Sequence, residues 1–376
     1  MPHPPRLRLH QVVFGGVGGC AAVAVSLAEA LPKLDHVFTF YGLSAPDTET
    51  IHQCRERGIS WSHVVKKPGL DLRALTEVYD HLVSEQSDIV LMHSITAVPS
   101  GWLWKRSSNK PFIIVDHTAP AARSATVGVS VALSLVVADA FVALTPANRA
   151  ALIKRAGFLR HLAERAIVIP NGISTRRFSP AKPPRARSGF TISMTARFCA
   201  ARDHIGLVEG ISALLMLEPS LRDSLRVVLA GDGETRLQVE HAIKRLDLAD
   251  VIELPGFISE SQVVALMRET DVYVQWSFAD SMSTSVMQAM ACGVAVVATN
   301  THGMSFLVED GQTGYLLDVG DSPALAETLL ELWENGDRRR SLGQVGRRHL
   351  VSKWSSETMA KRYSELFNQL HRAALE

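Results

Sequence analysis

The stretch Asp271–Gly303, DVYVQWSFADSMSTSVMQAMACGVAVVATNTHG, decides the fold of this chain. Its pattern predicts a buried strand at Val272–Gln275, a polar loop, a helix, a second buried strand at Ala295–Ala298 and a turn that contains glycine. Two apolar strands joined by a helix are the repeating unit of a parallel α/β sheet. We therefore expect an α/β protein.

Polar residues gather where the helix of this stretch should begin. Hydroxyl side chains at such a point can cap free backbone N–H groups, and the same N–H groups with the helix dipole favour an anion. Asp280 precedes the turn and Gln288 lies eight residues later on the helix, so both can reach one cleft. The pattern favours a phosphate-bearing carbohydrate ligand. The hydroxyl residues are Ser281, Ser283, Thr284 and Ser285.

The segment resembles the signature of glycosyltransferase family 4, which contains retaining enzymes of the GT-B fold. That signature is Glu, seven residues, Glu and then Ala-Met-Ala-x-Gly-x-Pro-Val-Val-Ala. Here Asp280 and Gln288 stand at the two Glu positions, and AMACGVAVVA follows at 289–298. The chain departs from the signature at both of these positions and at Ala295, which replaces Pro. An ordinary strand–helix–strand unit is the alternative interpretation.

Composition bounds the class of protein. A chain of 376 residues exceeds the usual single domain, and 47% hydrophobic with 20% charged residues describes a folded chain with a large core. Residues 1–180 carry 19 Lys and Arg against 13 Asp and Glu, a balance of +6, whereas the remainder has a balance of −5. The first half is thus expected to meet an anionic surface or substrate. No nucleic-acid-binding motif appears, so no nucleic-acid partner is expected.

The cysteines and the apolar runs of the sequence indicate the cellular compartment of the protein. Cys20, Cys54, Cys199 and Cys292 lack metal-type spacing, which favours a reduced, cytoplasmic compartment. The segment VVFGGVGGCAAVAVSLAEA at 12–30 follows two arginines and mimics a signal peptide. Its glycines favour strand, loop and helix instead. The apolar run 125–145 is interrupted by Asp139, so no membrane span is expected.

Apolar runs alternate with helical patterns along the whole chain, and a Pro-rich basic segment at 179–188 separates two series. This order predicts two Rossmann-like doubly wound domains whose ligand crevices lie at the carboxyl ends of the strands. The family resemblance implies that they form the GT-B fold, with an acceptor-binding domain at 1–180 and a nucleotide-sugar-binding domain at 181–355. By resemblance, a terminal helix at 356–376 crosses back to the first domain. The expected strands are Gln11–Phe14, His36–Tyr41, Ile89–Met92, Phe112–Val115, Ala140–Leu144, Ala166–Ile169, Thr191–Met194, Arg226–Leu229, Val251–Glu253, Val272–Gln275, Ala295–Ala298 and Gly314–Leu317.

Glycine-rich turns follow two of these strands. The loop Gly15–Gly19 lets backbone approach a ligand closely, and the resemblance implies that Gly16 contacts the donor. Such a loop alone is a weak signal, because dinucleotide-binding domains use one too. No acid follows a second strand as a nicotinamide site would require. Gly231 and Gly233 match the Gly-x-Gly turn of the family, and the resemblance implies that they contact the nucleotide-sugar.

Basic and aromatic residues extend the resemblance. Arg197 and Arg202 in TARFCAARDH fall on the two positions that clamp the donor diphosphate in the family. Arg202 replaces Lys, which keeps the charge but alters its geometry. The alternative for each is a solvated surface charge. Phe257 and Ile258 match the loop that lies beside the nucleotide base.

Two histidines end neighbouring strands. His117 in IIVDHTAP stands where the family carries a His that contacts the donor sugar. His93 in LMHSIT ends the preceding strand, and we interpret it as structural.

The resemblance implies a retaining glycosyltransferase that uses arginines and backbone N–H groups instead of a metal, so we expect no metal and no cofactor. It would move a sugar from a nucleotide-sugar donor, preferably a UDP-sugar, to a glycan or polyprenyl-diphosphate-linked acceptor in cell-surface polysaccharide or glycoconjugate synthesis. The resemblance implies that the diphosphate is bound by Arg197, Arg202 and backbone N–H groups near Ser283, Thr284 and Ser285. It further implies that Asp280 binds sugar hydroxyls, that Gln288 binds the ribose and that His117 orients the sugar. Two alternatives are a nucleotide-sugar 2-epimerase and a non-catalytic nucleotide-sugar-binding protein.

One basic segment raises the question of a membrane. Residues 149–165, RAALIKRAGFLRHLAER, combine five basic residues with Leu152, Ile153, Phe158 and Leu159. This segment is expected either to lie on the anionic inner face of a membrane or to be a surface helix whose apolar residues pack on the first domain. The balance of +6 in residues 1–180 favours the membrane.

Overall fold

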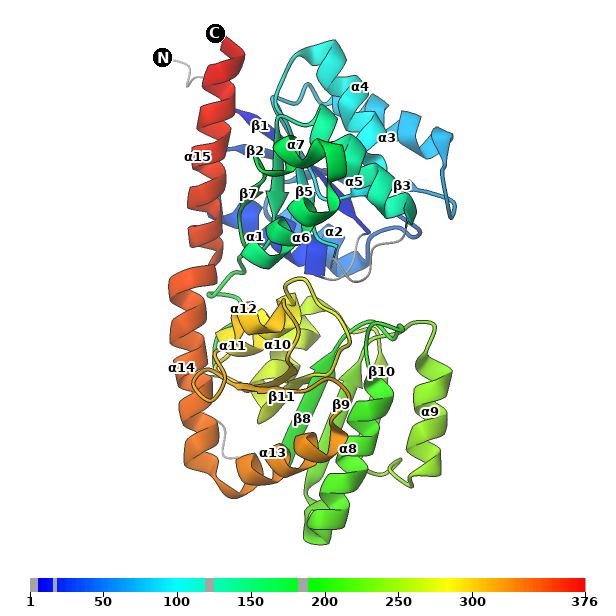
Figure 1. The fold of residues 1–376 in the computed structure, drawn as a ribbon, viewed down its shortest axis with the longest axis vertical. Coiled ribbons are helices and arrows are strands. Elements are labelled where there is room, and N and C mark those ends of the chain that lie inside the picture. Colours follow the sequence, from blue (N-terminus) through cyan, green and yellow to red (C-terminus); the bar gives the residue numbers. More distant parts are fainter. Residues whose placement is uncertain (1–5, 16–18, 119–124, 182–188, 376) are drawn as a thin grey trace. The chain divides into compact units, whose positions relative to one another are not determined.

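The computed structural model describes residues 6–15, 19–118, 125–181 and 189–375. The chain forms two compact units: unit 1 comprises residues 1–174 and 354–376, and unit 2 comprises residues 175–353. Each unit is a parallel β-sheet packed with helices, as the alternating sequence pattern predicts (Figure 1). The division falls at Ser174, slightly before the expected boundary at 180.

Unit 1 contains, in the part that the structure describes, a seven-stranded parallel sheet in the order β3-β2-β1-β4-β5-β6-β7. Successive strands are added to one side of β1 up to β3 and to its other side from β4 onward, so the strand order reverses between the adjacent strands β1 and β4. A ligand crevice is expected at the carboxyl ends of these two strands. The strands are β1 (Arg8–Phe14), β2 (Asp35–Gly42), β3 (Ser60–Val65), β4 (Ile89–Met92), β5 (Phe112–Asp116), β6 (Ala140–Ala143) and β7 (Ile167–Val168). The main helices are α1 (Gly19–Ala30), α2 (Thr48–Glu56), α3 (Leu72–Ser84), α4 (Val98–Ser108), α5 (Ala125–Val137), α6 (Pro146–Arg155), α7 (Arg160–Ala163) and α15 (Ser356–Leu375).

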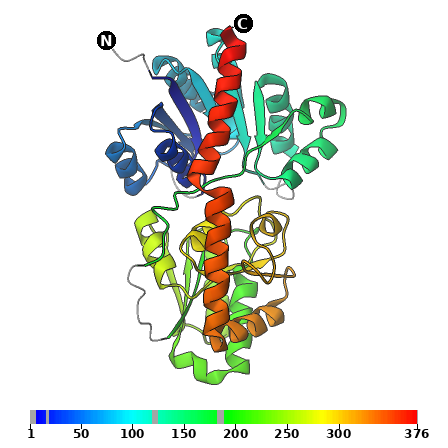
Figure 2. The same cartoon turned by 90° about the vertical axis from the view of Figure 1, so that its left-hand side faces the viewer.

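The end of the chain completes unit 1. Helix α15 packs against α1 (Figure 2). Gly172 allows the chain to approach this helix closely, because a Cβ there would lie 2.5 Å from the carbonyl oxygen of Ser355. The Gly172 N–H donates to Met359 Sδ at 3.1 Å. Gly172 therefore has a structural role in unit 1.

Unit 2 contains, among its described residues, a six-stranded parallel sheet in the order β10-β9-β8-β11-β12-β13. Its strand order reverses between β8 and β11, which are parallel neighbours and end at Thr195 and Gln275. The strands are β8 (Phe190–Thr195), β9 (Leu225–Ala230), β10 (Ile252–Gly256), β11 (Val272–Gln275), β12 (Ala295–Thr299) and β13 (Tyr315–Leu317). The helices are α8 (His204–Leu217), α9 (Arg236–Arg245), α10 (Glu260–Glu269), α11 (Thr284–Ala291), α12 (Met304–Leu307), α13 (Ser322–Glu334) and α14 (Gly336–Trp354).

Two features of unit 1 differ from the sequence predictions. Strand β3 was not predicted, because it lies at the sheet edge and Val64 is its one buried residue. The segment 149–165 is not one helix: α6 ends at Arg155, and a 3₁₀ turn at Gly157–Leu159 precedes α7. Gly157 adopts a φ of +55°, which breaks the helix. None of the helices that the structure describes has the length and apolar character needed to span a bilayer.

Candidate functional site

The start of α11 lies at the carboxyl edge of the unit 2 sheet. Ser283 caps this helix, and its Oγ accepts a hydrogen bond from Val286 N at 3.4 Å. Ser285 Oγ donates to the carbonyl oxygen of Thr195 at 2.9 Å, which ties α11 to the end of β8. The two hydroxyls thus hold the helix in place. The backbone N–H groups of the first turn, near Thr284, are the groups that suit an anion.

Asp280 and Arg202 form an ion pair beside this helix. Arg202 Nη2 lies 2.7 Å from Asp280 Oδ1, and Arg202 Nη1 donates to the carbonyl oxygen of Ala279 at 2.7 Å. The two loops meet because Arg202 and Ser277 are bridged by backbone pairing. Burial raises the pKa of Asp280, and the nearby Arg202 guanidinium opposes that rise. The sequence predicted both residues for the site but not their contact.

Arg197 is exposed on the loop that follows β8. The backbone of this loop is pinned on both sides of Arg197, since Ala196 N donates to Ala230 O at 3.0 Å and Phe198 N donates to Asp232 O at 3.0 Å. The loop therefore has a fixed path. Arg197 and Arg202 both follow β8, so their loop lies at the carboxyl edge of the sheet, where Arg202 pairs with Asp280.

Gly231 and Gly233 make that path possible. A Cβ at Gly231 would lie 1.9 Å from the carbonyl oxygen of Ala196, and one at Gly233 would lie 2.2 Å from that of Phe198. Their φ angles are +142° and +153°, a region that side chains disfavour. The structure thus gives these glycines a role beyond the predicted ligand contact, because they let the turn press against the Arg197 loop.

The loop after β10 joins the same edge. Gly231 N donates at 2.8 Å to the carbonyl oxygen of Gly256, the last residue of β10. The loop after β9 is therefore hydrogen-bonded both to the loop after β8 and to the point where the loop after β10 begins. Phe257 is 52% exposed, and Ile258 packs on a small cluster that includes Val228. An exposed aromatic ring at this point suits a planar base. Gln288, one turn along α11 from Thr284, is a buried polar residue.

In unit 1, His117 follows β5 and His93 follows β4. His93 Nδ1 lies 2.9 Å from His117 Nε2, and His93 Nε2 lies 3.0 Å from Gln11 Oε1. Gln11 Nε2 donates to the carbonyl oxygen of Ala24 at 3.4 Å, so its Oε1 is an acceptor. His93 must therefore carry its proton on Nε2, and His117 Nε2–H donates to His93 Nδ1. This chain of bonds fixes the tautomer of His117.

Burial keeps both rings neutral at physiological pH. It lowers the pKa of His117 to about 4 and that of His93 well below its ordinary value. His93 was interpreted from the sequence as a structural residue, and Gln11 was not identified as its partner. Gln11 could have been found as a polar residue inside an apolar strand, since it is 0% exposed in β1 and a buried amide needs hydrogen-bond partners.

Gly16, predicted to contact the donor, lies outside the described residues. The neighbouring Gly15 has a φ of +66°, and its N–H donates to the carbonyl oxygen of Tyr41 at 2.9 Å. The chain thus leaves β1 in a sharp turn, as expected for a glycine-rich loop.

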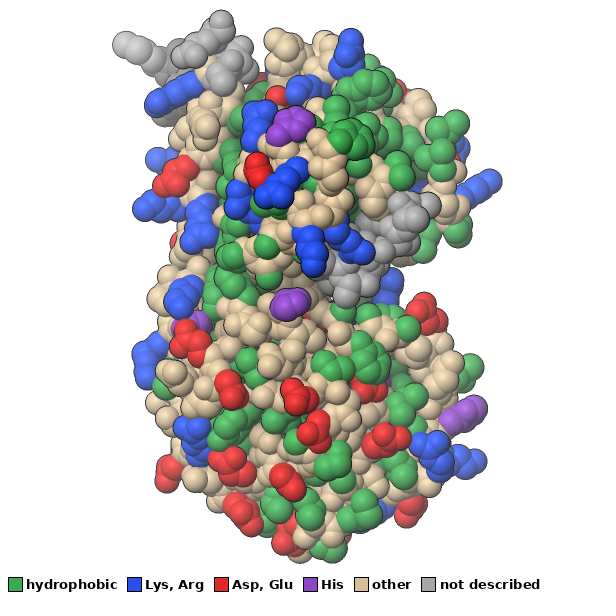
Figure 3. Space-filling view, in the orientation of Figure 1, with side chains coloured by type: hydrophobic (Ala, Val, Ile, Leu, Met, Phe, Trp, Pro, Cys, Tyr) green, Lys and Arg blue, Asp and Glu red, His purple; other side chains and the backbone are tan. Residues whose placement is uncertain are grey.

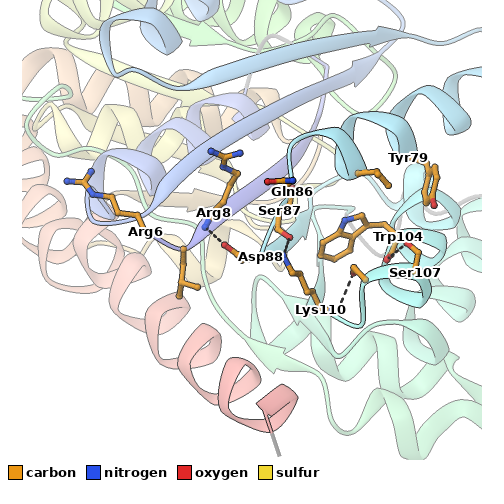
Figure 4. Close-up of a pocket in the computed structure, with 12 residues that line it drawn as sticks. Arg6, Arg8, Tyr79, Gln86, Ser87, Asp88, Trp104, Ser107 and Lys110 are labelled. Carbon is orange, nitrogen blue, oxygen red and sulfur yellow. Dashed lines mark hydrogen bonds and ion pairs between the residues drawn. The ribbon is translucent and has the colours of Figure 1, made fainter. Parts of the chain in front are cut away.

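A cavity of about 780 Å³ lies at the opposite, amino edge of the unit 1 sheet (Figure 4). Its charged side chains are paired with each other or with neighbours: Arg8 Nη2 lies 2.9 Å from Asp35 Oδ2, and Lys110 Nζ lies 2.9 Å from Asp88 Oδ1. This cavity is separated from His117 by the length of the strands, so it is not part of the candidate site.

The two parallel α/β units define a GT-B protein, and each carries its polar residues at the carboxyl edge of its sheet. Residues 17–177 match the family model described as Glycosyltransferase Family 4, and residues 185–349 match Glycosyl transferases group 1. The chain belongs to the group 1 glycosyltransferases of family 4, as the sequence motifs predicted.

Relatives agree with this assignment. A D-inositol 3-phosphate glycosyltransferase of Paenarthrobacter aurescens is 27% identical over 218 residues, 56% of this chain and 53% of the relative. A GDP-mannose-dependent monoacylated alpha-(1-6)-phosphatidylinositol monomannoside mannosyltransferase of Corynebacterium glutamicum is 24% identical over 217 residues, 53% of this chain and 55% of the relative. The chain spans about half the length of these curated relatives.

A solved structure covers much more of the chain. HepE of Anabaena, in complex with UDP and glucose, superposes with a TM-score of 0.80 at 19% identity, over 97% of this chain and 100% of HepE. At this identity the likeness shows the fold alone. It confirms the predicted GT-B fold.

Proposed function

We propose that this chain is a retaining glycosyltransferase that uses a nucleotide-sugar donor, with a UDP-sugar favoured. The observation that carries the proposal is the carboxyl edge of unit 2, where exposed Arg197, the Arg202–Asp280 pair and the first turn of α11 are held by three hydrogen-bonded loops. Cations and N–H groups fixed in advance stabilise the charge that develops on a departing diphosphate. HepE, which shares the fold, is bound to UDP and glucose in its crystal structure.

Each residue then has a stated role. Arg197 and the N–H groups near Thr284 bind the diphosphate. Arg202 supplies a second, weaker attraction, because its charge is shared with Asp280. Asp280 also accepts from sugar hydroxyls, and Gln288 hydrogen-bonds the ribose. Phe257 and Ile258 flank the base.

His117 orients the sugar. Since its Nε2–H donates to His93, its Nδ1 is the acceptor nitrogen of the ring and suits a hydroxyl group of the sugar. In the reaction, the bond from the anomeric carbon to the diphosphate oxygen breaks while the acceptor oxygen bonds to the same face. The acceptor proton passes to the departing phosphate, so no side chain needs to act as nucleophile. Arginines neutralise the diphosphate, and the mechanism requires no metal.

Radiolabelled UDP- and GDP-sugars, incubated with the chain, test this function. Transfer or hydrolysis supports a transferase, and inversion at C2 supports an epimerase. Binding without turnover supports a binding protein, an alternative favoured by the replacement of both signature Glu residues at Asp280 and Gln288.

Substitution of Arg197 separates a diphosphate clamp from a surface charge. A charge-assisted contact contributes about 1.5–3 kcal/mol, so Arg197→Ala should lower kcat/KM at least roughly tenfold. Arg222→Ala is a matched control, because Arg222 pairs with Asp250 at 2.7 Å on the surface of the same unit. Equal activity of the two variants would remove Arg197 from the clamp.

The proposed acceptor is a glycan or a polyprenyl-diphosphate-linked glycan, in cell-surface polysaccharide or glycoconjugate synthesis. We further propose that the chain works at the anionic inner face of a membrane. In the segment 149–165, Leu152 is buried and Ile153 and Leu159 pack on the core of unit 1, whereas Phe158 is 89% exposed. On the face drawn in Figure 3, Lys and Arg side chains gather on unit 1, whereas Asp and Glu side chains gather on unit 2. The mannosyltransferase relative is named for a monoacylated phosphatidylinositol monomannoside.

Vesicle sedimentation tests the membrane proposal. Binding should require anionic lipid, weaken with added salt, and fall when Lys154, Arg155 and Arg160 become Glu, because each basic residue adds about 1 kcal/mol near such a surface. Binding that ignores lipid charge would instead indicate a soluble acceptor.

A further inference from the structure

Three potential metal ligands from distant parts of the sequence meet in unit 1. The Sγ atom of Cys20 and one ring nitrogen each of His93 and His117 lie within 4.8 Å of one another. Cys20 is in the first turn of α1, which follows β1, while the histidines follow β4 and β5. Since β1, β4 and β5 are neighbours in the sheet, their carboxyl ends bring the three side chains to one edge.

The hydrogen bonds around His93 are those of a metal-binding histidine. Such a residue usually donates its second N–H to an oxygen of the protein, which fixes the ring and leaves the other nitrogen to the metal. His93 Nε2–H donates to Gln11 Oε1 at 3.0 Å, and Gln11 is itself held by Ala24 O. Nδ1 of His93 therefore presents its lone pair towards His117.

The spacing of the ligand atoms suits zinc after a small adjustment. His93 Nδ1 and His117 Nε2 are 2.9 Å apart. Two nitrogens on one tetrahedral Zn²⁺ lie about 3.4 Å apart, given Zn–N bonds of about 2.0–2.1 Å. The rings need to separate by a few tenths of an ångström, and the Cys20 Sγ atom, which lies within 4.8 Å of a nitrogen of each ring, needs to move closer.

We propose that Cys20, His93 and His117 bind a thiophilic divalent cation, Zn²⁺, and that this binding inhibits the enzyme. Thiolate sulfur with two imidazole nitrogens is a donor set that zinc prefers, and three protein ligands leave a fourth position for water. On binding, the proton of His117 moves from Nε2 to Nδ1, and the S–H bond of Cys20 breaks as the S–Zn bond forms. The thiol proton passes to water.

Zinc binds histidine as a neutral ring and cysteine as a thiolate. Binding should therefore release about one proton for each zinc, that of the Cys20 thiol.

Inhibition follows from the proposed role of His117. A zinc ion on Nε2 reverses the tautomer of the ring, so Nδ1 becomes a donor and no longer accepts from a sugar hydroxyl. This part of the inference rests on the proposed function, whereas metal binding does not.

Metal binding is measured on the full chain with Zn²⁺ by calorimetry and with Co²⁺ by absorbance. The wild-type chain should bind one Zn²⁺, and its Co²⁺ form should show a thiolate charge-transfer band. Cys20→Ser should lose the band and bind zinc at least tenfold more weakly. Gln11→Leu, which removes the partner of His93, should weaken binding by about 10–100-fold while it keeps the band.

Cys199→Ser is the matched control, because Cys199 is also a half-buried thiol but lies in unit 2. It should bind zinc like the wild type, and thermal melting confirms that each variant is folded. Equal zinc affinity in Cys20→Ser and Cys199→Ser would overturn the site.

Zinc titration of donor turnover tests inhibition separately. The wild-type chain and Cys199→Ser should be inhibited at a zinc concentration at least tenfold lower than Cys20→Ser, with each variant scored against its own uninhibited rate. A wild-type chain that binds zinc through Cys20 and turns over unchanged would refute the inhibitory role alone. A chain without turnover would contradict the proposed function and leave the calorimetric result to judge the site.

Discussion

Alanine at Gly231 should destabilise unit 2 and displace Arg197. The new Cβ would lie 1.9 Å from the carbonyl oxygen of Ala196, so backbone must move by more than 1 Å to reach an ordinary contact. A side chain at a φ of +142° costs about 1–3 kcal/mol. The movement also strains two hydrogen bonds, from Ala196 N and Phe198 N, worth about 0.5–1.5 kcal/mol each. The expected loss is roughly 2–6 kcal/mol.

Urea denaturation measures this loss, with Gly320→Ala as the control. Gly320 also has a positive φ, +82°, but a Cβ there meets nothing within 4 Å. Its substitution should cost only the strain of the backbone, about 1–2 kcal/mol. UDP binding should weaken in Gly231→Ala and remain unchanged in Gly320→Ala. Equal losses of stability in the two variants would refute the argument from close approach.

Three further substitutions probe other parts of the structure. Arg202→Ala leaves the buried carboxylate of Asp280 without its cation and should destabilise the protein by up to about 3–5 kcal/mol. Adding Asp280→Asn should restore more than half of the lost stability, as measured by denaturant melts. No recovery in the double variant would contradict the stabilising role of the pair. Burial lowers the pKa of His10 from 6.5 to about 3. As pH drops from 6.5 towards 3, this side chain binds a proton in the unfolded chain but not in the folded one. Its contribution therefore lowers the free energy of unfolding by about 1.4 kcal/mol per pH unit. His10→Gln should reduce that slope, and an unchanged slope would count against it. Gln288→Glu should keep or improve nucleotide affinity and Gln288→Ala should weaken it; identical affinities would place this side chain away from the nucleotide.

Central strands could be predicted well from the sequence, because they are buried on both faces. Ile89–Met92 and Val272–Gln275 have the expected bounds, and all their residues are buried. The edge strand Ser60–Val65 has no such apolar run. The break at Gly157 was missed because apolar residues on either side of it, such as Ile153 and Leu159, still fit a helical period.

Pairings between distant residues were the harder part of the site. Motif spacing placed Arg202 and Asp280 in the site, but their contact depends on loops that follow different strands. Gln11 and His93 are 82 residues apart, and their hydrogen bond depends on strand order. Cys20 meets the histidines for the same reason, so no local spacing rule could detect the cluster. The family signature supplied residue roles that periodicity alone does not.

Proton NMR of the anomeric signals during hydrolysis of UDP-glucose tests the central claim most directly. The donor is chosen because HepE, which shares the fold, is bound to UDP and glucose in its crystal structure. We predict that the first sugar released by the wild-type chain has the α configuration of the donor, and that Arg197→Ala slows its release at least roughly tenfold. Release of β-glucose first would contradict a retaining mechanism, and release at the same rate by Arg197→Ala would contradict the diphosphate site at the carboxyl edge of unit 2.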